Sequence, residues 1–225
     1  MSLDQVWLDK FKDDSWFTER PGAWAIVNGG KQQMSSAKSN LHNLQCLLSN
    51  MCEYGKQNWS YEPGTATSVE NMLKGVQRPV DCNSLATAFQ QIANHVIFEG
   101  RSSVNKLHIQ EAGHRIVTKK GMISFDGQKG DDSIDTRWCF GDHFIAEFEG
   151  QCFDPTFNFT SFSLAQINDT YLGWYGKEVK GQDCFTSTMW QAPAGNGEAK
   201  DIYVRLSPNF AYTYKKTNKQ TGVEC

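Results

Sequence analysis

The chain has 225 residues and a formal net charge of −3, so it is long enough to bury a sizeable core and has no excess of basic side chains for nucleic acid or anionic lipid. Hydrophobic residues make up 39% and charged residues 21%, and no apolar run approaches the roughly 20 residues that cross a bilayer. We therefore expect one globular domain over residues 1–225, with neither nucleic acid nor membrane as a partner.

The N-terminal residues and the cysteines indicate the compartment. Residues 1–4 lack the basic region and apolar core of a signal peptide, so a cytoplasmic protein is expected, with export by a signal-less route as the alternative. The seven cysteines are odd in number and include no Cys-x-x-Cys pair. Mostly reduced thiols are therefore expected, which leaves room for one disulfide.

Four helices are expected in the first half of the chain, over residues 2–12, 37–56, 68–75 and 81–98. Each range has apolar residues at helical spacing or begins at a residue that can cap a helix. Between the first two, aromatic residues and a break at Pro21-Gly22 indicate a loop. The last helix has an apolar face formed by Leu85, Phe89, Ile92 and Val96.

After Gly100 the apolar residues recur at every second position, which predicts strands. The strands are expected over residues 104–109, 137–140, 143–148, 151–159, 202–206 and 210–214. Residues 114–119 and 122–125 are expected to form a further hairpin around Lys120-Gly121. Helices followed by strands in this order predict one compact α+β domain.

Cys82 stands at the start of the last predicted helix. Unpaired amide N–H groups and the positive end of the helix dipole meet there, and both favour the thiolate, the form that attacks a carbonyl carbon. Cys82 is therefore the candidate nucleophile, and the chain must also supply a base and a group that orients it. The alternative for Cys82 is a buried structural thiol.

A histidine and an aspartate in residues 141–156 can supply the base and the orienting group. The expected hairpin turn is Glu149-Gly150, and symmetric pairing about it sets Ile145 opposite Asp154. Because His143 shares a strand face with Ile145, it lies diagonal to Asp154 at a backbone separation of about 7–8 Å, within reach of the side chains. The alternatives are a hydrogen-bonded strand histidine and a turn-initiating Asp-Pro.

A cysteine that opens a helix, then a histidine on a strand, then Asp-Pro on the next strand resembles the transglutaminase-like superfamily. The resemblance covers about residues 59–159 and includes Tyr61 and residues 68–75 before the cysteine. The family usually has Gly before its cysteine, whereas this chain has Asp81, whose charge opposes ionisation of a close thiol. The resemblance implies a papain-like α+β fold in which a nucleophile helix packs on an antiparallel β-sheet.

It also implies a catalytic triad of Cys82, His143 and Asp154, acting without a cofactor on an amide of a protein or peptide. The thioester acyl-enzyme would then react with water, as in a peptidase or deamidase, or with an amine, as in a transglutaminase. The sequence does not decide between these fates, because access to the thioester chooses the acceptor. The Cys82 amide is one expected donor to the oxyanion, and Gln77 and Trp59 are candidates for the second.

Three other interpretations remain open from the sequence. The first is a non-catalytic peptide-binding or interaction module on the same fold, and the second is a bacterial toxin or effector domain that modifies glutamine. The third is a zinc site formed by Cys139, His143 and Cys152, which lacks the Cys-x-x-Cys knuckle of structural zinc sites and is disfavoured for that reason. No metal is therefore expected, and the sequence does not indicate an oligomeric state.

Overall fold

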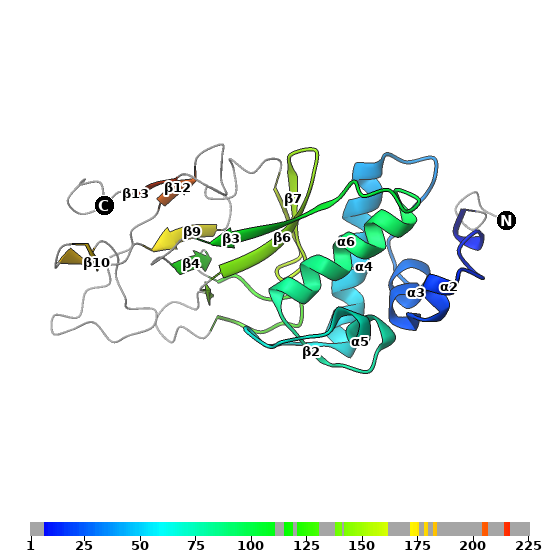
Figure 1. Ribbon diagram of the computed structural model, residues 1–225, viewed down its shortest axis with the longest axis horizontal. Coiled ribbons are helices and arrows are strands. Elements are labelled where there is room, and N and C mark those ends of the chain that lie inside the picture. The colour runs from blue at the N-terminus through cyan, green and yellow to red at the C-terminus, as the bar shows by residue number, and fades with distance from the viewer. Residues whose placement is uncertain are drawn as a thin grey trace. The chain divides into compact units, whose positions relative to one another are not determined.

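The computed structural model describes residues 7–110, 115–118, 121–130, 138–140 and 142–161, together with five short strands between residues 172 and 216 (Figure 1). It has the mixed α+β character that the sequence predicts, with helices and an antiparallel four-stranded sheet. Contacts between Cα atoms divide the chain into two compact units. That these units form the single domain expected from the sequence stays a prediction.

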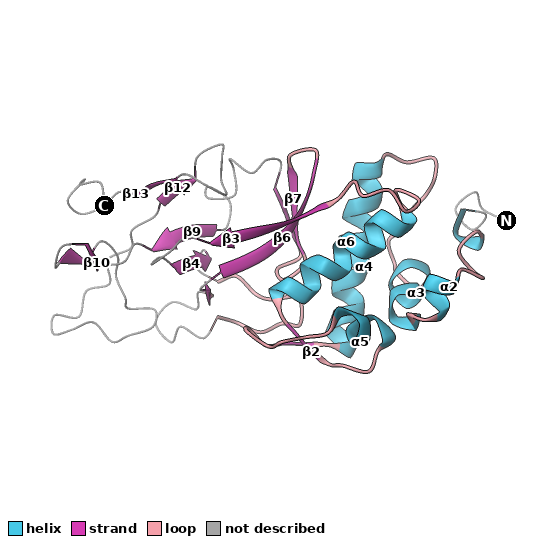
Figure 2. Cartoon of the chain, viewed as in Figure 1, coloured by secondary structure: helices cyan, strands magenta, loops and turns pink. Residues whose placement is uncertain are grey.

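The first unit comprises Met1–Leu107, Ser124–Gln128 and Phe144–Thr160 and contains all the helices whose bounds are described (Figure 2). These are α2 (Ser15–Thr18), α3 (Pro21–Asn28), α4 (Asn40–Asn58), α5 (Val69–Lys74) and α6 (Cys82–Val96). The last three match the sequence predictions to within a few residues. None of the helices in the described part of the chain is long and apolar enough to span a membrane.

Helix α3 corrects the prediction of a loop around Pro21-Gly22. Pro21 is the first residue of the helix, where a missing N–H costs nothing and the fixed backbone angle suits the helix. Gly22 is buried, and a side chain there would clash with the Leu73 carbonyl of α5. Pro21 therefore starts a helix and Gly22 allows two helices to approach closely, where the sequence had predicted a break.

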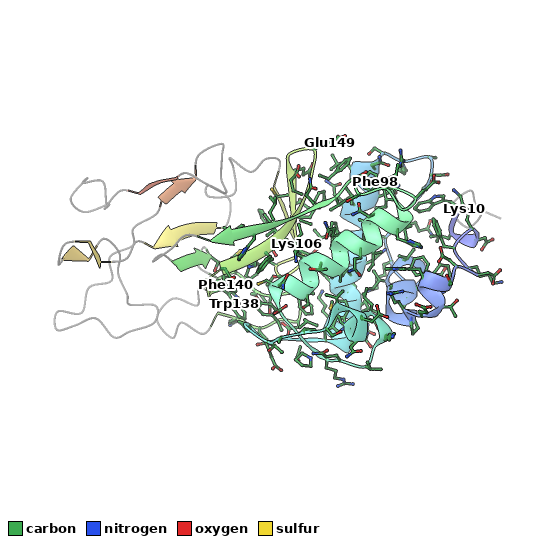
Figure 3. All side chains as sticks on the ribbon, in the orientation of Figure 1. Lys10, Phe98, Lys106, Trp138, Phe140 and Glu149 are labelled. Carbon is green, nitrogen blue, oxygen red and sulfur yellow. The ribbon has the colours of Figure 1, made fainter. Side chains whose placement is uncertain are left out.

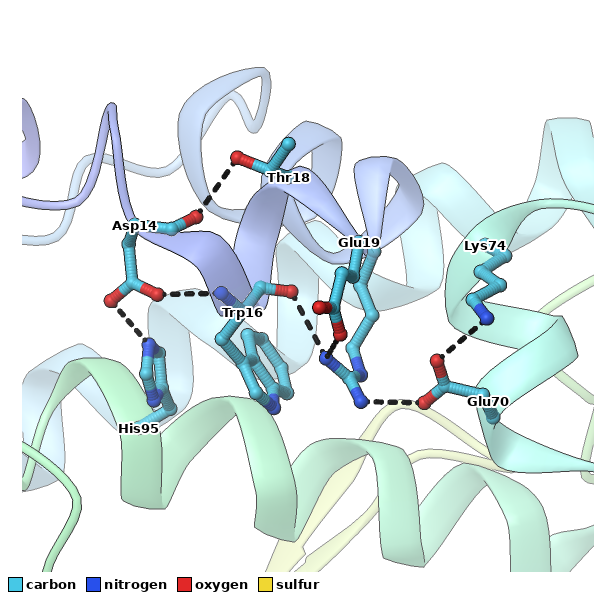
Figure 4. A network of polar contacts seen from close by, with 8 residues as sticks. Asp14, Trp16, Thr18, Glu19, Glu70, Lys74 and His95 are labelled. Atoms are coloured by element: carbon cyan, nitrogen blue, oxygen red, sulfur yellow. Dashed lines mark hydrogen bonds and ion pairs between the residues drawn. The ribbon is translucent and has the colours of Figure 1, made fainter.

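A polar network attaches the N-terminal segment to helices α5 and α6 (Figure 4). His95 of α6 lies with its Nε2 2.8 Å from an oxygen of Asp14, and its ring stacks on Trp16 at a centroid distance of 4.5 Å. The Arg20 guanidinium lies over the Trp16 ring, 4.9 Å from its centroid, and pairs with Glu70 of α5 at 2.7 Å. His95 thus has a structural partner at the C-terminal end of α6, far along the helix from Cys82.

The principal sheet has the strand order β3-β6-β7-β8. Its strands are β3 (Asn105–Gln110), β6 (Asp142–Phe148), β7 (Gln151–Asp154) and β8 (Phe159–Ser161). Strands β6 and β7 are antiparallel, with Phe148 opposite Gln151, which is the symmetric register that the sequence predicts. Glu149 and Gly150 have φ angles of 49° and 83°, the positive values of a tight two-residue turn, and Glu149 lies at the hairpin tip (Figure 3).

Aromatic contacts hold α6 on the β6–β7 hairpin. Phe89 stacks on Phe153 with ring centroids 5.4 Å apart, and Phe98, just beyond the helix, packs on Phe148 at 4.9 Å. Burying one such ring contributes about 2–3 kcal/mol to folding. The predicted apolar face of α6 is therefore its core face, and it packs on the strand that carries Asp154.

Strands β4 (Arg115–Thr118), β5 (Cys139–Phe140) and β9 (Leu172–Tyr175) form a sheet of order β5-β4-β9 in the second unit. The hairpin predicted for residues 114–119 and 122–125 is therefore wrong, because β4 pairs with distant strands. Two antiparallel pairs follow, β10 (Glu178–Val179) with β11 (Gln182–Asp183) and β12 (Val204–Leu206) with β13 (Tyr214–Lys216). The last pair matches the two predicted closing strands, with the second displaced along the chain.

Candidate active site

Cys82 is the first residue of α6, as the sequence predicts, and 8% of it is exposed. A reciprocal capping box fixes this helix start. The Ser84 N–H donates to the Asp81 carboxylate at 2.7 Å, and the Asp81 N–H donates to the Ser84 hydroxyl at 3.0 Å. Asp81, which stands where the resembled family usually has Gly, therefore serves here as the N-cap of the nucleophile helix.

Two short parallel strands position the approach to Cys82. Strand β1 (Ser60–Tyr61) pairs with β2 (Pro79–Val80), which ends two residues before the cysteine. The Glu62 N–H donates to the Val80 carbonyl at 2.8 Å. Since Tyr61 lies opposite Val80, the strand that delivers the nucleophile is held against the strand that carries this tyrosine.

Tyr61 is 1% exposed and lies near the candidate nucleophile. The pKa of its hydroxyl responds to the nearby Cys82, Asp154 and Thr156. Burial raises the pKa of Tyr61 well above its ordinary value, and the nearby Cys82 and Asp154 raise the pKa further. Cys82 and Asp154 therefore share one buried neighbourhood around Tyr61, entirely inside the first unit.

Asp154 ends strand β7 and is 1% exposed. One oxygen of its carboxylate accepts the Thr156 N–H at 2.9 Å, which closes the turn after the strand. Extending the β6–β7 register by one residue sets Ile145 opposite Asp154, as the sequence predicts. The turn bond orients the carboxylate, so the turn-forming role and the orienting role are compatible.

His143 lies on β6 and is 0% exposed. Its ring stacks on Phe140 at a centroid distance of 4.7 Å, inside the second unit. A buried imidazole packed on an aromatic ring has few orientations open to it. The Cys82–His143 pair joins residues of the two units, and it stays a prediction.

Lys106 of β3 ties the sheet to the first turns of α6 (Figure 3). Its ammonium group donates to the Asn83 side chain at 2.7 Å and to the Thr87 hydroxyl at 3.0 Å. It also lies 5.2 Å from the Phe144 ring centroid, a cation–π contact. The positive charge of Lys106 is therefore held beside Asn83, the residue that follows Cys82.

Three other buried cysteines lie in environments that keep the thiol protonated. Burial, followed by the charge of Asp154, raises the pKa of Cys52, whose Sγ–H donates to the Pro155 carbonyl at 3.5 Å. Burial and the charges of Glu147 and Asp154 raise the pKa of Cys152 to about 12. Burial also raises the pKa of Cys46.

The two candidates for a second oxyanion donor differ in their environments. Trp59 is buried between Tyr54 and Phe125, and its indole N–H finds no acceptor among the described residues. Gln77 is half-buried, and its amide oxygen accepts the Ser68 N–H at 3.2 Å, which leaves its NH₂ group as the donor. Both stay predictions.

The sequence interpretation missed the roles of Tyr61, Thr156, Asp126 and Gln128. The sequence places Tyr61 only in the stretch before the nucleophile and indicates no role for the other three. The available signal was local: Thr156 follows Asp-Pro, and Asp126-Gly127 is a turn pair. Neither signal says that Asp126 and Gln128 bond to the Tyr61 backbone.

Metal binding has no support in the described part of the chain, where no three His, Cys, Asp or Glu side chains are placed to hold an ion. The side chain of Cys139, needed for the zinc alternative, lies outside the described residues. Comparison of the chain with protein-family models, curated proteins and solved structures found no match. The structure therefore shows an α+β fold with a buried thiol at a helix N-terminus, and the family stays an expectation from the sequence.

Proposed function

We propose that this chain is a cysteine-dependent amide hydrolase or acyltransferase with a transglutaminase-like, papain-like fold. Its substrate is an amide group of a protein or peptide, and the reaction needs no cofactor. The observation that carries the proposal is the position of Cys82, which opens α6 and shares a buried neighbourhood with Asp154. Burial raises the thiol pKa of Cys46, Cys52 and Cys152.

In the first half-reaction the Cys82 thiolate attacks the amide carbonyl carbon, and a tetrahedral intermediate forms. Its oxyanion accepts a hydrogen bond from the Cys82 backbone N–H and from a second donor. The His143 imidazolium gives its proton to the leaving nitrogen as the C–N bond breaks, while Asp154 holds the imidazole in orientation. The products are a thioester at Cys82 and a free amine or ammonia.

In the second half-reaction, neutral His143 removes a proton from water or from an amine, which attacks the thioester carbonyl. The C–S bond breaks and Cys82 leaves as the thiolate. Water gives a carboxylic acid, and an amine gives a new amide. Which of the two reaches the thioester defines the activity as peptidase, deamidase or transglutaminase.

A non-catalytic peptide-binding module is the second candidate function. The observation that favours it is the burial of all three proposed triad residues, none of which exceeds 8% exposure. An active site must open to its substrate, whereas a structural cluster can remain closed. A module that merely retains the cluster for packing should have no fast-reacting cysteine.

The deciding experiment has two parts. Alkylation of the native protein with iodoacetamide at about pH 6, where an ordinary thiol is well under 1% ionised, should modify Cys82 first, and His143→Ala should abolish this preference. Incubation with a glutamine-containing peptide, with and without a primary amine, should give deamidation, amine incorporation or cleavage, which mass spectrometry separates. Slow labelling at Cys82 together with no peptide product would select the binding module.

A further inference from the structure

Lys106 of β3 is held at the start of α6 by neutral groups. Its ammonium group donates to Asn83 Oδ1 at 2.7 Å and to the Thr87 hydroxyl at 3.0 Å, and it lies 5.2 Å from the Phe144 ring centroid. All four residues belong to the first unit, which also contains Cys82. The lysine, labelled in Figure 3, therefore has a defined position beside the residue that follows the candidate nucleophile.

The contacts of Lys106 leave its charge without a counter-charge. The ammonium groups of Lys10 and Lys74 pair with glutamates at 3.3 and 3.0 Å, but no carboxylate in the described ranges forms an ion pair with Lys106. The carboxylate of Asp81, on the other side of Cys82 in the chain, accepts the Ser84 N–H. Because Lys106 is half-buried, its field is also less screened by water than that of a fully exposed lysine.

The lysine also fixes the orientation of the Asn83 side chain. An ammonium group can only donate, so the amide oxygen of Asn83 faces it and the NH₂ group faces away. The Thr87 hydroxyl donates to the Asn83 carbonyl at 2.7 Å, so it offers Lys106 a lone pair. Asn83 is exposed, and its NH₂ group donates to no acceptor among the described residues. A cation and an amide donor thus stand together with no acceptor between them.

These donors lie one residue from the nucleophile. The Cα atoms of Cys82 and Asn83 are about 3.8 Å apart across their trans peptide bond. An extended peptide advances about 3.4 Å per residue, so a substrate amide at Cys82 brings side chains from one or two positions away to Asn83 and Lys106. A carboxylate is the side chain that fits there, because it accepts hydrogen bonds at both oxygens and supplies the missing negative charge.

We propose that Lys106 and Asn83 form a subsite for a carboxylate of the substrate, so that this chain prefers an aspartate or glutamate within two residues of the reacting amide. The inference rests on the proposed function and names a substrate class for it. Lys106 supplies the charge, and Asn83 supplies a directed N–H donor. Thr87 and Phe144 hold the lysine, so the carboxylate meets a cation whose side chain is ordered before the substrate binds.

Two alkylating reagents of nearly equal size test this charge without a known substrate. Iodoacetate carries a carboxylate where iodoacetamide carries a neutral amide, and with both reagents the Cys82 thiolate forms a bond to the CH₂ carbon as iodide leaves. The ratio of the two rates at Cys82, read by peptide mass spectrometry on the full-length protein, measures the local attraction for an anion. A change in the ionisation of Cys82 alters both rates equally and cancels in the ratio.

Lys106→Met keeps an unbranched side chain of similar length and removes the charge. The ratio of the iodoacetate rate to the iodoacetamide rate should fall by about threefold to tenfold at low ionic strength, and the difference from wild-type protein should shrink in about 1 M salt. Lys106→Arg restores a cation and should keep the ratio within about twofold of the wild-type value. A lysine that serves only in packing would leave the ratio unchanged in Lys106→Met.

Lys10→Met is the matched control. It removes the same charge from the same unit, but Lys10 pairs with Glu99, which lies beyond the C-terminal end of α6. A helix of 15 residues is about 22 Å long, more than two Debye lengths at physiological ionic strength, so the ratio should equal that of the wild-type protein.

Asn83→Asp gives a second variant of the subsite. The added carboxylate should pair with Lys106 and lower the ratio as Lys106→Met does, and a negative charge suits the first turn of a helix. It decides the question if Lys106→Met does not fold, as judged by circular dichroism.

Peptide substrates extend the test to turnover. The peptides carry Glu or Met at each of the two positions on either side of a reacting glutamine. With Glu at one of these positions, the kcat/KM of the wild-type protein should be about threefold to tenfold higher than with Met, and Lys106→Met should abolish this preference.

The outcomes separate the subsite from the proposed function. If wild-type Cys82 reacts with iodoacetamide at about pH 6 no faster than N-acetylcysteine, the proposed function and the subsite both fail. If Cys82 is fast but the reagent ratio is the same in wild-type, Lys106→Met and Asn83→Asp proteins, the subsite alone fails. A ratio that rises in Lys106→Met, or a preference for Glu that survives in this variant, would also overturn the subsite.

Discussion

Two cysteines of this molecule have almost the same burial and stand in opposite chemical settings. Cys46 lies in the middle of α4 with its sulfur 3.4 Å from His42 Nε2, whereas Cys82 is the first residue of α6. Burial raises the pKa of Cys46, and the charge of Lys38 opposes this rise only in part. Amide N–H groups in the middle of a helix are already bonded, so no partial positive charge faces Cys46.

The comparison shows that a short Cys–His distance does not identify a nucleophile. His42 is one helical turn before Cys46 and is exposed, so the pair follows from helix geometry alone. Around Cys82, by contrast, a capped helix terminus, a buried phenol and a carboxylate come from three separate segments of the chain. We take this convergence, and not proximity to a histidine, as the mark of a site.

Replacing Cys82 and Cys46 separately by alanine should give the largest difference in turnover. Cys82→Ala should reduce turnover of a peptide amide by at least about a thousandfold, because it removes the sulfur that forms the thioester in the proposed reaction. Cys46→Ala should keep near-wild-type turnover and cost about 1–2 kcal/mol of unfolding free energy through lost packing. Enzyme assays and thermal melts on both variants measure this, and an active Cys82→Ala protein would contradict the proposed site.

Asp154 can be separated from its role in the turn by an isosteric change. Asp154→Asn keeps an oxygen that accepts the Thr156 N–H, so the melting temperature should change little. The variant loses the charge that orients and stabilises the imidazolium, and turnover should fall by about a hundredfold or more. Equal activity in Asp154→Asn and wild-type protein would show that Asp154 serves only to form the turn.

The loop of residues 124–128, which holds Tyr61, predicts an intermediate effect on the free energy of unfolding, and this effect depends on pH. Because the pKa of Asp126 is lower in the folded chain than in an unfolded one, its ionisation stabilises the fold above the unfolded-state pKa, and this is lost as the pH falls through the lower, folded-state value. Asp126→Asn should cost about 1 kcal/mol at neutral pH, allowing for partial exposure, and less in acid. Urea titrations at about pH 7 and pH 3 test this; a loss that is constant with pH would contradict it.

The smallest expected effect comes from removing the N-terminal caps of α6 and α4. Ser84→Ala breaks the capping box at Cys82, and Ser39→Ala removes the N-cap of α4, whose hydroxyl accepts the His42 N–H at 3.2 Å. Each should cost about 1 kcal/mol of unfolding free energy. Only Ser84→Ala should also slow the labelling of Cys82 at about pH 6, since it loosens the turn that presents the thiol. Equal labelling in both variants would show that the cap does not influence the sulfur.

Much of the candidate site could be predicted because its parts are local. The start of α6 follows from Asp81 and Ser84, which lie within one helical turn of Cys82. The β6–β7 register follows from a two-residue turn whose second member is a glycine with positive φ. Both features depend on neighbours in the chain, so sequence patterns contain the information needed to place them.

The amino-acid sequence by itself determined the helix that Cys82 opens, the hairpin that carries Asp154, and the α+β character of the chain, because capping, turn geometry and periodicity act over a few residues. Only the tertiary structure decided that Tyr61 lies near Cys82 and that the loop of residues 124–128 holds the backbones of Tyr61 and Thr156. The same holds for β4, which was expected to pair with the next segment and pairs with strands far along the chain. A pattern of alternating residues shows that a segment is extended, but its partner is chosen by which contacts bury the most apolar surface and satisfy the most backbone groups in the whole fold.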